Sequence, residues 1–437
     1  MGADMDIWWL IIYAIPFFGI TAYYVRRQRR VHAHHRQTLQ EAIAAGMTEP
    51  ASLHPLIDPS KCLGCGACVT ACPETPHHDV LGLIDGKAVL VNPTECIGHG
   101  ACKTACPFDA ITLVFGTERR GLDIPLLKPT FESNVPGIYV AGELGGMGLI
   151  KNALTQGQQA LEAIAASRVK RAGALDVLII GAGPAGLAAS LAAKKLGMNY
   201  QTVEQDRLGG AVFQYPRGKL VMTAPVELPI VGKVQFRNTT KEELLEFWTL
   251  ACKGLKIRYQ ERVESVERKD GAFHVRTGAA QYIAANVLLA IGRRGTPRKL
   301  GVPGEELPKV VYRLIDPEQY RGQKVMVVGG GDSALEAAAS IAELGDTEVT
   351  LSYRGEAFQR AKTRNRQRVD AAKTKGQLEV MMNSQVREIR PQQILLERGG
   401  GTLMVRNDAL IVSAGGILPN EFLKSIGIDV ETKFGTA

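Results

Sequence analysis

Residues 176–187 read DVLIIGAGPAGL, an apolar run that leads directly into a G-x-G-x-x-G turn and an alanine-rich segment. This order predicts a buried strand, a tight turn and a helix. Glycines at these positions let the backbone approach a pyrophosphate, and the helix N-terminus stabilises its charge. A second predicted strand ends on Glu204, where a carboxylate typically holds a ribose hydroxyl. The stretch therefore predicts a dinucleotide-binding α/β fold, the alternative being a helix-capping turn without a ligand.

The same pattern returns at 324–334, KVMVVGGGDSA, with Ala334 in the third small position. The strand that follows, 347–354, ends on Arg354 and not on a carboxylate. An arginine there favours the 2′-phosphate of NADP, the alternative being an arginine that only faces solvent. Two such folds in one chain predict one site for FAD and one for a nicotinamide donor.

Seven of the eight cysteines lie between residues 62 and 106, in two related runs. The first, 62–73, reads CLGCGACVTACP and has the C-x2-C-x2-C-x3-C-P spacing of bacterial ferredoxins. The second, 96–107, reads CIGHGACKTACP, with His99 in place of the second cysteine. Such a group in a long chain is typical of metal binding and not of a disulfide framework. Residues 55–115 therefore resemble a two-cluster ferredoxin.

The ferredoxin resemblance implies that each run supplies ligands to both clusters. One cluster would be bound by Cys62, Cys65, Cys68 and Cys106, and the other by Cys72, Cys96, Cys102 and His99. For the second cluster two alternatives stay open: a [4Fe–4S] cluster with a histidine ligand, and a three-iron cluster that leaves His99 unbound. Zinc is a weaker alternative, because the two C-P endings are typical of ferredoxins. His77 and His78, between the runs, are expected to face solvent.

Residues 7–25, IWWLIIYAIPFFGITAYYV, carry no charge and would form a helix about 28 Å long, close to the roughly 30 Å of a bilayer core. Tryptophans at one end and tyrosines at the other match aromatic belts, and arginines follow from residue 26. The order of charges excludes a cleaved signal peptide. We therefore expect a single-pass anchor in a bacterial inner membrane, with the N-terminus outside and the bulk of the chain cytoplasmic. The net charge of +8 is partly concentrated there, which favours a membrane over nucleic acid.

From residue 176 onward the chain resembles thioredoxin-reductase-like flavoproteins, and most of all their bacillithiol-disulfide reductase branch. The resemblance rests on the two glycine-rich turns, LGG at 208–210, FQYP at 213–216, AIG at 290–292 and AGGILPN at 414–420. It implies that FAD is bound by Gly181, Gly183, Pro184, Ala185, Gly186, Glu204, Gly209, Gly210 and Gly292. It implies that the nicotinamide nucleotide is bound by Gly329, Gly331, Asp332, Ser333 and Arg354.

One element of that family stands in an unexpected place. Such flavoproteins end with a strand and a helix, reading roughly VPGIYVAGD, that close over the flavin. Here VPGIYVAGELGGM lies upstream at 135–147, and a predicted helix follows over 149–166. The resemblance therefore implies a circular permutation, the alternative being a linker hairpin. Gly142 and Glu143 would then join the FAD site, with Glu143 in place of the usual aspartate.

The expected fold class is multidomain α/β, with a transmembrane helix, an α+β two-cluster ferredoxin module and two Rossmann-like three-layer nucleotide-binding domains. The expected domains are an anchor (1–25), a basic linker (26–54), the ferredoxin module (55–115), a permuted FAD-domain segment (118–171), the FAD domain (175–300), the NAD(P)H domain (301–408) and a return to the FAD domain (409–437).

The chain lacks the cysteines that its flavoprotein relatives use. It has no C-x-x-C in the nicotinamide domain, and Ala185 stands where the bacillithiol branch has a cysteine. Thiol–disulfide exchange needs a thiolate near the flavin. The remaining thiol, Cys252, is expected in a helix as a core residue. Disulfide reduction is therefore disfavoured, and the clusters would replace the disulfide as the redox partner of the flavin.

We therefore expect an oxidoreductase without a catalytic side chain, which transfers electrons between NAD(P)H, FAD and two iron–sulfur clusters. Its expected partners are NAD(P)H and a membrane-associated or ferredoxin-type electron carrier, and no nucleic acid. A thiol–disulfide reductase and a non-catalytic redox sensor are the alternatives. The acceptor, the direction of electron flow and the oligomeric state stay open, a homodimer being one alternative.

Overall fold

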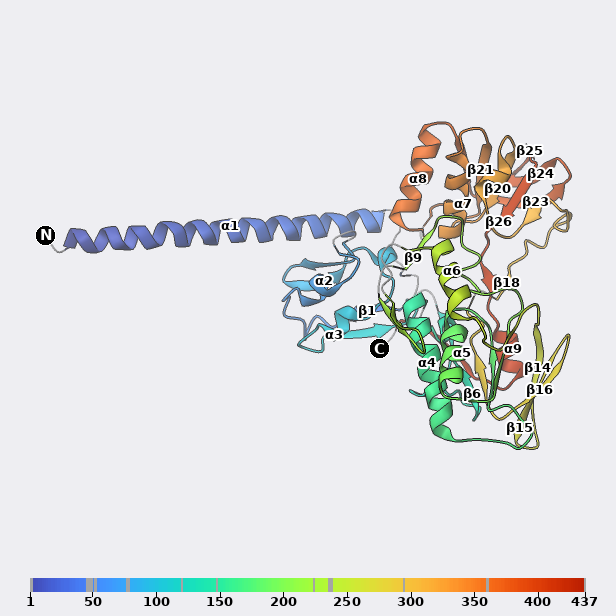
Figure 1. Cartoon of the computed structure of the whole chain (residues 1–437). Helices are drawn as coiled ribbons and strands as arrows, with labels where there is room; N and C mark the ends of the chain where they lie inside the picture. The colour runs from blue at the N-terminus through green and yellow to red at the C-terminus, as the bar shows by residue number, and fades with distance from the viewer. Residues whose placement is uncertain are drawn as a thin grey trace. The chain divides into compact units, whose positions relative to one another are not determined.

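The computed structural model describes residues 3–44, 50, 53–75, 79–118, 121–146, 148–222, 225–234, 239–293, 295–358 and 361–435. The chain forms two compact units (Figure 1). One contains residues 1–50 and 54–114, and the other contains residues 115–436. His77 and His78, which the sequence placed in solvent, lie outside the described residues.

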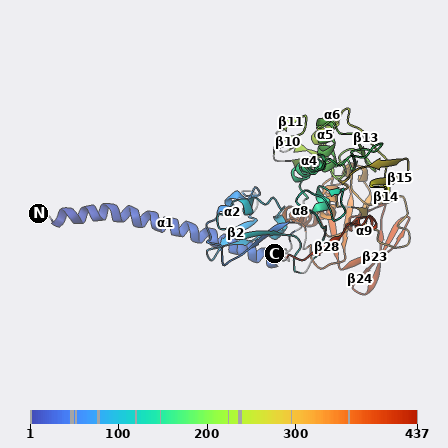
Figure 2. The same ribbon diagram turned by 90° about the horizontal axis from the view of Figure 1, so that it is seen from below.

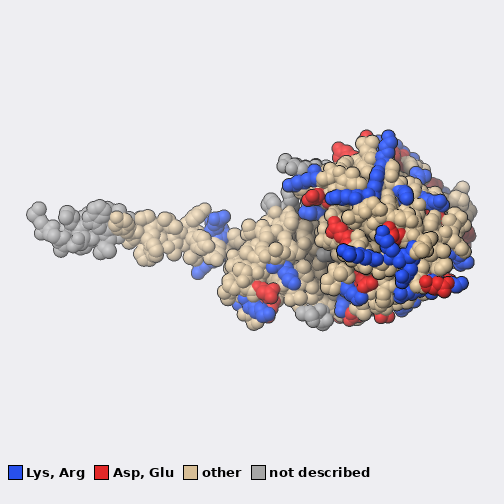
Figure 3. Space-filling model, turned by 60° about the horizontal axis from the view of Figure 1, so that its bottom comes forward, with Lys and Arg blue, Asp and Glu red and all other residues tan. Residues whose placement is uncertain are grey.

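Helix α1 (Ala3–Ala44) is one continuous helix across the predicted anchor and the basic linker. Its described side chains from Tyr13 to Val25 are uncharged and mostly exposed, and the basic ones follow (Figure 3). Among the described residues, however, no helix combines the length and the apolar character needed to cross a bilayer. The predicted transmembrane anchor is therefore wrong, and so is the single-pass placement in a bacterial inner membrane. The physical reason is composition, because proline, glycine and tyrosine dilute the aliphatic side chains of this stretch before the arginines end it.

The second half of α1 packs against the ferredoxin module of the first unit. His35 is buried, and its Nδ1 accepts a hydrogen bond from the Leu83 backbone N–H at 2.9 Å. Gly82 makes this close approach feasible, since a Cβ there would lie 2.6 Å from the His35 ring. Arg36 and Asp85 form an ion pair beside it.

The module itself is built from two short hairpin-like sheets and two small helices. Strand β1 (His54–Ile57) pairs antiparallel with β4 (Ile111–Val114), and β2 (Leu81–Ile84) pairs antiparallel with β3 (Lys87–Leu90). Helices α2 (Ala67–Ala71) and α3 (Ala101–Thr104) occupy equivalent places in the two cysteine runs, and a 3-10 turn, η1 (Pro93–Glu95), precedes the second. Several of the cysteines belong to the buried core, so the module has little aliphatic interior of its own.

The second unit contains two lobes of similar plan, which Figure 2 shows from below. The first lobe holds a parallel sheet in the order β13-β8-β7-β17-β6. Its strands are β13 (Ile257–Arg258), β8 (Tyr200–Val203), β7 (Val177–Ile180), β17 (Val287–Leu289) and β6 (Ile138–Val140). Helices α4 (Ile150–Ser167) and α5 (Pro184–Lys195) pack against each other and on this sheet. An antiparallel meander completes the lobe, made of β14 (Val263–Lys269), β15 (Ala272–Thr277) and β16 (Gln281–Ala284).

The second lobe repeats this plan. Its parallel sheet has the order β19 (Val310–Val311), β26 (Ala409–Val412), β20 (Lys324–Val328), β21 (Glu348–Tyr353) and β22 (Leu378–Met382). Helices α7 (Asp332–Ala342) and α8 (Thr363–Thr374) pack on it, and the meander consists of β23 (Ser384–Arg390), β24 (Gln393–Arg398) and β25 (Gly401–Arg406). Shorter elements complete the second unit. They are β9 (Leu220–Met222), β10 (Val226–Leu228), β11 (Gly232–Val234), β12 (Thr239–Thr240), α6 (Lys241–Ala251), β18 (Thr296–Pro297), η3 (Pro317–Tyr320), β27 (Gly416–Ile417) and α9 (Asn420–Ser425).

Segments from the two ends of the second unit complete the first lobe together. Strand β28 (Val430–Lys433) pairs antiparallel with β5 (Leu122–Pro125), in a register that sets Lys433 opposite Leu122. Residues 135–166, expected from the sequence to form a strand and a helix, contain β6 and most of α4, and β6 is the edge strand beside β17. This stretch, called the displaced segment below, therefore contributes a strand to the sheet of the first lobe.

Candidate functional site

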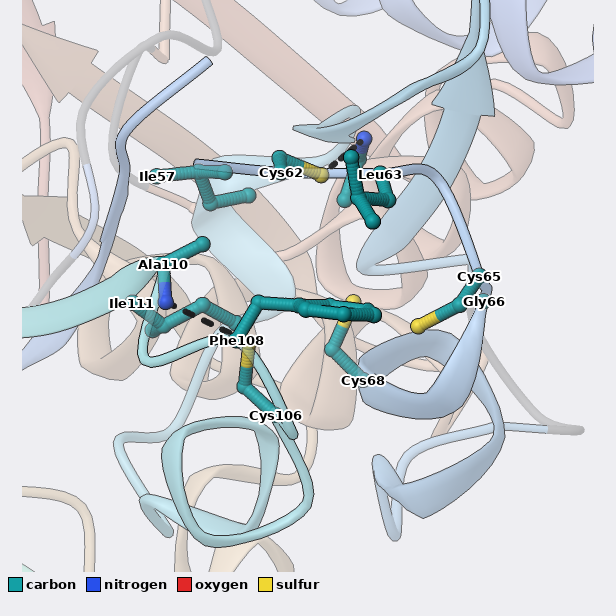
Figure 4. A pocket seen from close by; sticks show the side chains of 11 residues that line it. Ile57, Cys62, Leu63, Cys65, Gly66, Cys68, Cys106, Phe108, Ala110 and Ile111 are labelled. Carbon is teal, nitrogen blue, oxygen red and sulfur yellow. Dashed lines mark hydrogen bonds between the residues drawn. The ribbon is translucent and has the colours of Figure 1, made fainter. Parts of the chain in front are cut away.

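Four cysteines from the two runs surround one hollow of the ferredoxin module. Its lining includes Cys62, Cys65, Cys68 and Cys106 (Figure 4). Apolar side chains fill the rest of the wall, among them Ile57 and Ile111. The first run thus supplies three thiols, and the fourth comes from the end of the second run, as the ferredoxin resemblance implies.

Backbone N–H groups point at two of these sulfur atoms. Cys62 Sγ accepts from the N–H groups of Gly64 and Ala88, both at 3.4 Å, and Cys106 Sγ accepts from Ala110 at 3.4 Å. Gly64 has a φ of +65°, and a Cβ there would clash with the Gly86 carbonyl oxygen. Such donors stabilise negative charge on sulfur, which suits thiolates bound to iron.

A second hollow is lined by the other four predicted ligands. Its lining includes Cys72, Cys96, His99 and Cys102. The three cysteines are buried, whereas the His99 side chain keeps 24% of its surface exposed. His99 Nε2 lies 3.7 Å from Glu74 Oε1. The fold therefore brings His99 to the wall of this hollow together with the cysteines.

Burial affects the ionisation of the cysteine thiols in both hollows. Within the described ranges, no three or more histidine, cysteine, aspartate or glutamate side chains are arranged to hold one metal ion. Burial raises the pKa of Cys68 and of Cys96 to about 11, and it raises the pKa of Cys102 as well. Thiols buried in this way ionise only with a compensating positive charge, such as that of bound iron.

The first glycine-rich turn follows β7 and opens α5, as predicted. Gly181 has a φ of +108°, and a Cβ on Gly186 would clash with the Gly181 carbonyl oxygen. The buried Glu204 carboxylate accepts hydrogen bonds from the N–H groups of Ala182 at 2.7 Å and Asp206 at 2.9 Å. Burial raises the pKa of Glu204 above its usual range, and these two hydrogen bonds oppose that shift. The carboxylate thus lies directly against the turn.

Three further predicted FAD residues meet at the same turn, Gly142, Gly209 and Gly210. A Cβ on Gly142 would lie 3.0 Å from Ala185 Cβ, and Gly209 N–H donates to the Ala182 carbonyl oxygen at 3.0 Å. A Cβ on Gly210 would lie 3.1 Å from the Cα of Gly183, the residue before Pro184 at the start of α5. Glu143 begins the short turn η2 (Glu143–Gly145) beside Gly142, and Gly292 follows β17 with a φ of +66°. All of these lie at the carboxyl end of the parallel sheet, where such folds bind ligands.

Sequence reasoning missed the contact that holds the displaced segment on this turn. Gln156, on α4, accepts a hydrogen bond from Gly142 N–H at 2.9 Å through its Oε1. At the next residue of α4, a Cβ on Gly157 would clash with the Ala185 carbonyl oxygen. A glycine within a helical pattern was the available signal, because such a glycine often marks a close approach.

The second glycine-rich turn follows β20 and opens α7 with Asp332 and Ser333. Gly329 has a φ of +143°, and Gly331 precedes the helix. The Asp332 carboxylate does not face open space: its Oδ1 accepts from Lys362 N–H and from Asn365 Nδ2, both at 2.8 Å. Asp332 therefore ties the start of α8 to the turn. Arg354 is exposed directly after β21, at the carboxyl end of its strand.

Residues 178–435, more than half of the chain, match a family model described as pyridine nucleotide-disulphide oxidoreductase. The chain belongs to the pyridine nucleotide-disulphide oxidoreductase family. Residues 54–107 match a second model, described as a 4Fe-4S dicluster domain. The chain is thus an FAD-dependent oxidoreductase of this family with an iron–sulfur ferredoxin domain, and both predicted resemblances are confirmed.

Relatives within the family act on different redox partners. A ferredoxin–NADP reductase of Ignicoccus hospitalis is 32% identical over 267 residues, which are 59% of this chain and 83% of that protein. A bacilliredoxin reductase of Bacillus subtilis is 26% identical over 267 residues, 59% of this chain and 82% of that one. Among solved structures, the bacillithiol disulfide reductase of Bacillus cereus is similar with a TM-score of 0.53 and 27% identity, covering 58% of this chain and 82% of the other.

Cys252 is separate from these sites. It caps the end of α6 and is buried in an apolar cluster with Trp248 and Leu244. Burial raises its pKa to about 12. A thiol with that pKa is almost entirely protonated at neutral pH and is a poor nucleophile.

Proposed function

We propose that this chain transfers electrons between NAD(P)H and the iron–sulfur clusters of its own ferredoxin domain through FAD. The observation that carries the proposal is that one chain combines two four-ligand hollows with two glycine-rich dinucleotide turns. FAD supplies the step between a two-electron donor and one-electron acceptors. The similarity to the ferredoxin–NADP reductase of Ignicoccus hospitalis supports this assignment.

The cluster count is part of this proposal. We assign one cluster to Cys62, Cys65, Cys68 and Cys106 and the other to Cys72, Cys96, His99 and Cys102, because each set lines its own hollow. The residues of this chain position thiolates, donate backbone hydrogen bonds to sulfur and exclude water from the buried side of each hollow.

The preference for NADP over NAD is a second part of the proposed function. Arg354 offers a positive charge where a carboxylate would select NAD, so we propose NADP as the nicotinamide cofactor. The described segment after β21 adds further basic residues at the start of α8, Lys362, Arg364 and Arg366. Gly329 and Gly331 would admit the pyrophosphate to the N-terminus of α7.

The direct test uses the full chain, reconstituted with iron and FAD under argon and mixed with NADPH in a stopped-flow instrument. We expect flavin absorbance to fall first and the EPR signals of reduced clusters to follow. Full flavin reduction with clusters that stay oxidised, even at a large excess of NADPH, would show that electrons do not pass from NADPH to the clusters. The protein is then reduced with dithionite and mixed with NADP. Formation of NADPH would show that electrons flow from the clusters to NADP, and no NADPH would show that the clusters and the nucleotide do not exchange electrons.

A thiol–disulfide reductase is the second candidate, because the bacilliredoxin and bacillithiol reductases are relatives. In the chain, Cys252 is the one cysteine outside the two hollows, and it is buried. We therefore expect Cys252→Ser to leave the rate of NADPH-dependent cluster reduction unchanged. NADPH-dependent reduction of bacillithiol disulfide that is lost in Cys252→Ser would favour the second candidate.

A further inference from the structure

The internal repeat of the ferredoxin module places different residues at equivalent positions of its two hollows. The equivalent pairs are Leu63 and Ile97, Cys65 and His99, and Phe108 and Glu74. The end of the second run, with Cys106 and Phe108, lies at the first hollow together with Leu63 and Cys65. In each pair, the residue named first therefore belongs to the first hollow. The two hollows therefore differ most in the side chains that separate them from solvent.

The first hollow opens through exposed apolar side chains. Leu63 is 64% exposed and Phe108 is 41% exposed, and both line the hollow together with Cys65 (Figure 4). Of the seven cysteines in the two runs, all of them described, Cys65 alone is exposed. Contiguous exposed apolar side chains of this kind mark interaction sites more often than bare solvent-facing surface.

The second hollow has no such opening at the equivalent positions. His99 and Glu74 take the places of Cys65 and Phe108, lie 3.7 Å apart and keep 24% of each side chain exposed. Ile97 is half-buried, in contrast to Leu63. A polar pair thus stands where the first hollow presents an apolar rim.

Contacts inside the module hold Leu63 outward. Lys87 Nζ donates to the Cys62 carbonyl oxygen at 2.6 Å, and Cys62 Sγ accepts two backbone N–H groups. Gly64 packs so closely on the Gly86 carbonyl that only glycine fits. The exposure of Leu63 is therefore imposed by the loop on both sides of it.

The charge of the module indicates the chemistry of its partner. Residues 54–114 carry six acidic and three basic side chains. Beside the rim, Asp109 is exposed, and Lys61 is partly offset by Asp58 at 4.0 Å. The carboxylates of Asp109 and Asp58 beside the apolar rim favour a partner that presents basic residues around an apolar patch of its own.

We propose that Leu63, Cys65 and Phe108 form the face at which the module exchanges single electrons with a basic redox protein. The exchange moves one electron from the cluster of the first hollow to one ferric ion of the partner, which becomes ferrous, and it makes or breaks no covalent bond. This inference rests on the proposed function for its source of electrons, NAD(P)H. It assigns the exchange with this partner to the first hollow and not to the second.

The test uses cytochrome c, a basic haem protein, as the probe and the full holoprotein under argon. The variants are Leu63→Gln and Phe108→Gln, and the matched control is Leu56→Gln. Leu56 is 43% exposed on β1 of the same module but lines neither hollow. Calorimetry measures the Kd between the two oxidised proteins. Freeze-quench EPR follows the oxidation of clusters that were first reduced with dithionite and desalted.

We expect each rim variant to weaken binding and to slow cluster oxidation about tenfold, which corresponds to about 1.4 kcal/mol. Leu56→Gln should match the unmodified protein in both measurements, and added salt should slow the unmodified protein. A variant is informative only if its cluster EPR spectrum is unchanged, and because the two rim residues lie on different segments, one such variant is enough. An unchanged Kd and an unchanged rate of cluster oxidation in that variant would overturn the docking face. Equal losses of binding and rate in Leu56→Gln would overturn it as well.

Failure of this inference is separable from failure of the proposed function. Dithionite supplies the electrons directly, so the measurement does not depend on transfer from NADPH. Slow oxidation in the rim variants of a protein that NADPH cannot reduce would keep the docking face and remove the proposed function. Rapid cluster reduction by NADPH with no effect of the rim variants would do the opposite.

Discussion

His99 shows how one residue distinguishes two otherwise similar hollows lined by cysteines. It occupies the position of Cys65 in the repeat and lines the second hollow with three buried cysteines. A neutral imidazole in place of a thiolate removes one negative charge from the ligand set, and histidine ligation raises reduction potentials in iron–sulfur proteins. Glu74 Oε1 lies 3.7 Å from Nε2, which is longer than a hydrogen bond, so the carboxylate adds a nearby negative charge to the ring without a hydrogen bond to Nε2.

We therefore predict that His99→Cys lowers the reduction potential of the second cluster by on the order of 100 mV. EPR-monitored redox titration of the full chain measures this shift, and Cys65→His at the equivalent position of the first hollow should raise the other potential. Equal potentials before and after His99→Cys would show that His99 is not a ligand. An unmodified protein that binds one iron fewer than two [4Fe–4S] clusters require would favour the three-iron alternative.

Helix α4 shows how an element from the displaced segment supports the first dinucleotide turn. Gly157 lets α4 approach the start of α5 so closely that any Cβ would clash with the Ala185 carbonyl oxygen. On the same helix, Gln156 holds Gly142 by a hydrogen bond of 2.9 Å. Residues 142 and 185 come from distant parts of the sequence, so this packing brings the displaced segment to the FAD turn.

Gly157→Ala should therefore reduce both stability and FAD content. Replacing glycine by alanine inside a helix usually raises the free energy of unfolding by about 0.5–1 kcal/mol. Overpacking lowers the free energy of unfolding by about 1–3 kcal/mol, so we expect net destabilisation. The thermal midpoint and the ratio of flavin to protein after gel filtration measure the effect. Gln159→Ala, on an exposed position of α4, should change neither. An unchanged flavin ratio in Gly157→Ala would mean that the close approach does not govern FAD binding.

At the scale of the whole molecule, strands that are far apart in the sequence pair directly within the second unit. Strand β28 near the C-terminus pairs with β5, and Asp123 on β5 accepts hydrogen bonds from Asn420 at 2.6 Å and Thr432 at 2.7 Å. We propose that this is the circular permutation implied by the sequence. In that arrangement, no peptide segment connects β28 directly to β5, although the two strands pair. Instead, the chain runs directly from α4 into β7.

The permutation predicts that a rearranged chain still folds. Lys433 lies opposite Leu122, so a short glycine-rich turn can join residue 435 to residue 121. We expect residues 175–435, followed by such a turn and residues 121–168, to bind FAD with the absorption spectrum of the full chain. The same rearranged chain without residues 121–168 should lose flavin, because it lacks β6 and α4. Equal flavin binding by both versions would contradict a role for the displaced segment.

The sequence alone determined the features that depend on local pattern. The spacing of the cysteines, the two glycine-rich turns and the strand that ends at Glu204 are short-range arrangements, and backbone geometry permits few alternatives for them. They predicted the α/β fold, the ferredoxin domain and the family correctly. Hydropathy of a short window was a weaker guide: residues 7–25 are uncharged, yet the transmembrane prediction was wrong because absence of charge is not sufficient apolar character.

Tertiary structure alone decided which distant residues meet. It placed Gly142 and Gly157 against Ala185 and showed that Asp332 binds the start of α8. It also exposed Leu63 and Phe108 at one hollow while a polar pair stands at the other. The physical reason is that exposure and contact between distant residues depend on how whole elements pack, and no local pattern in the chain contains that information.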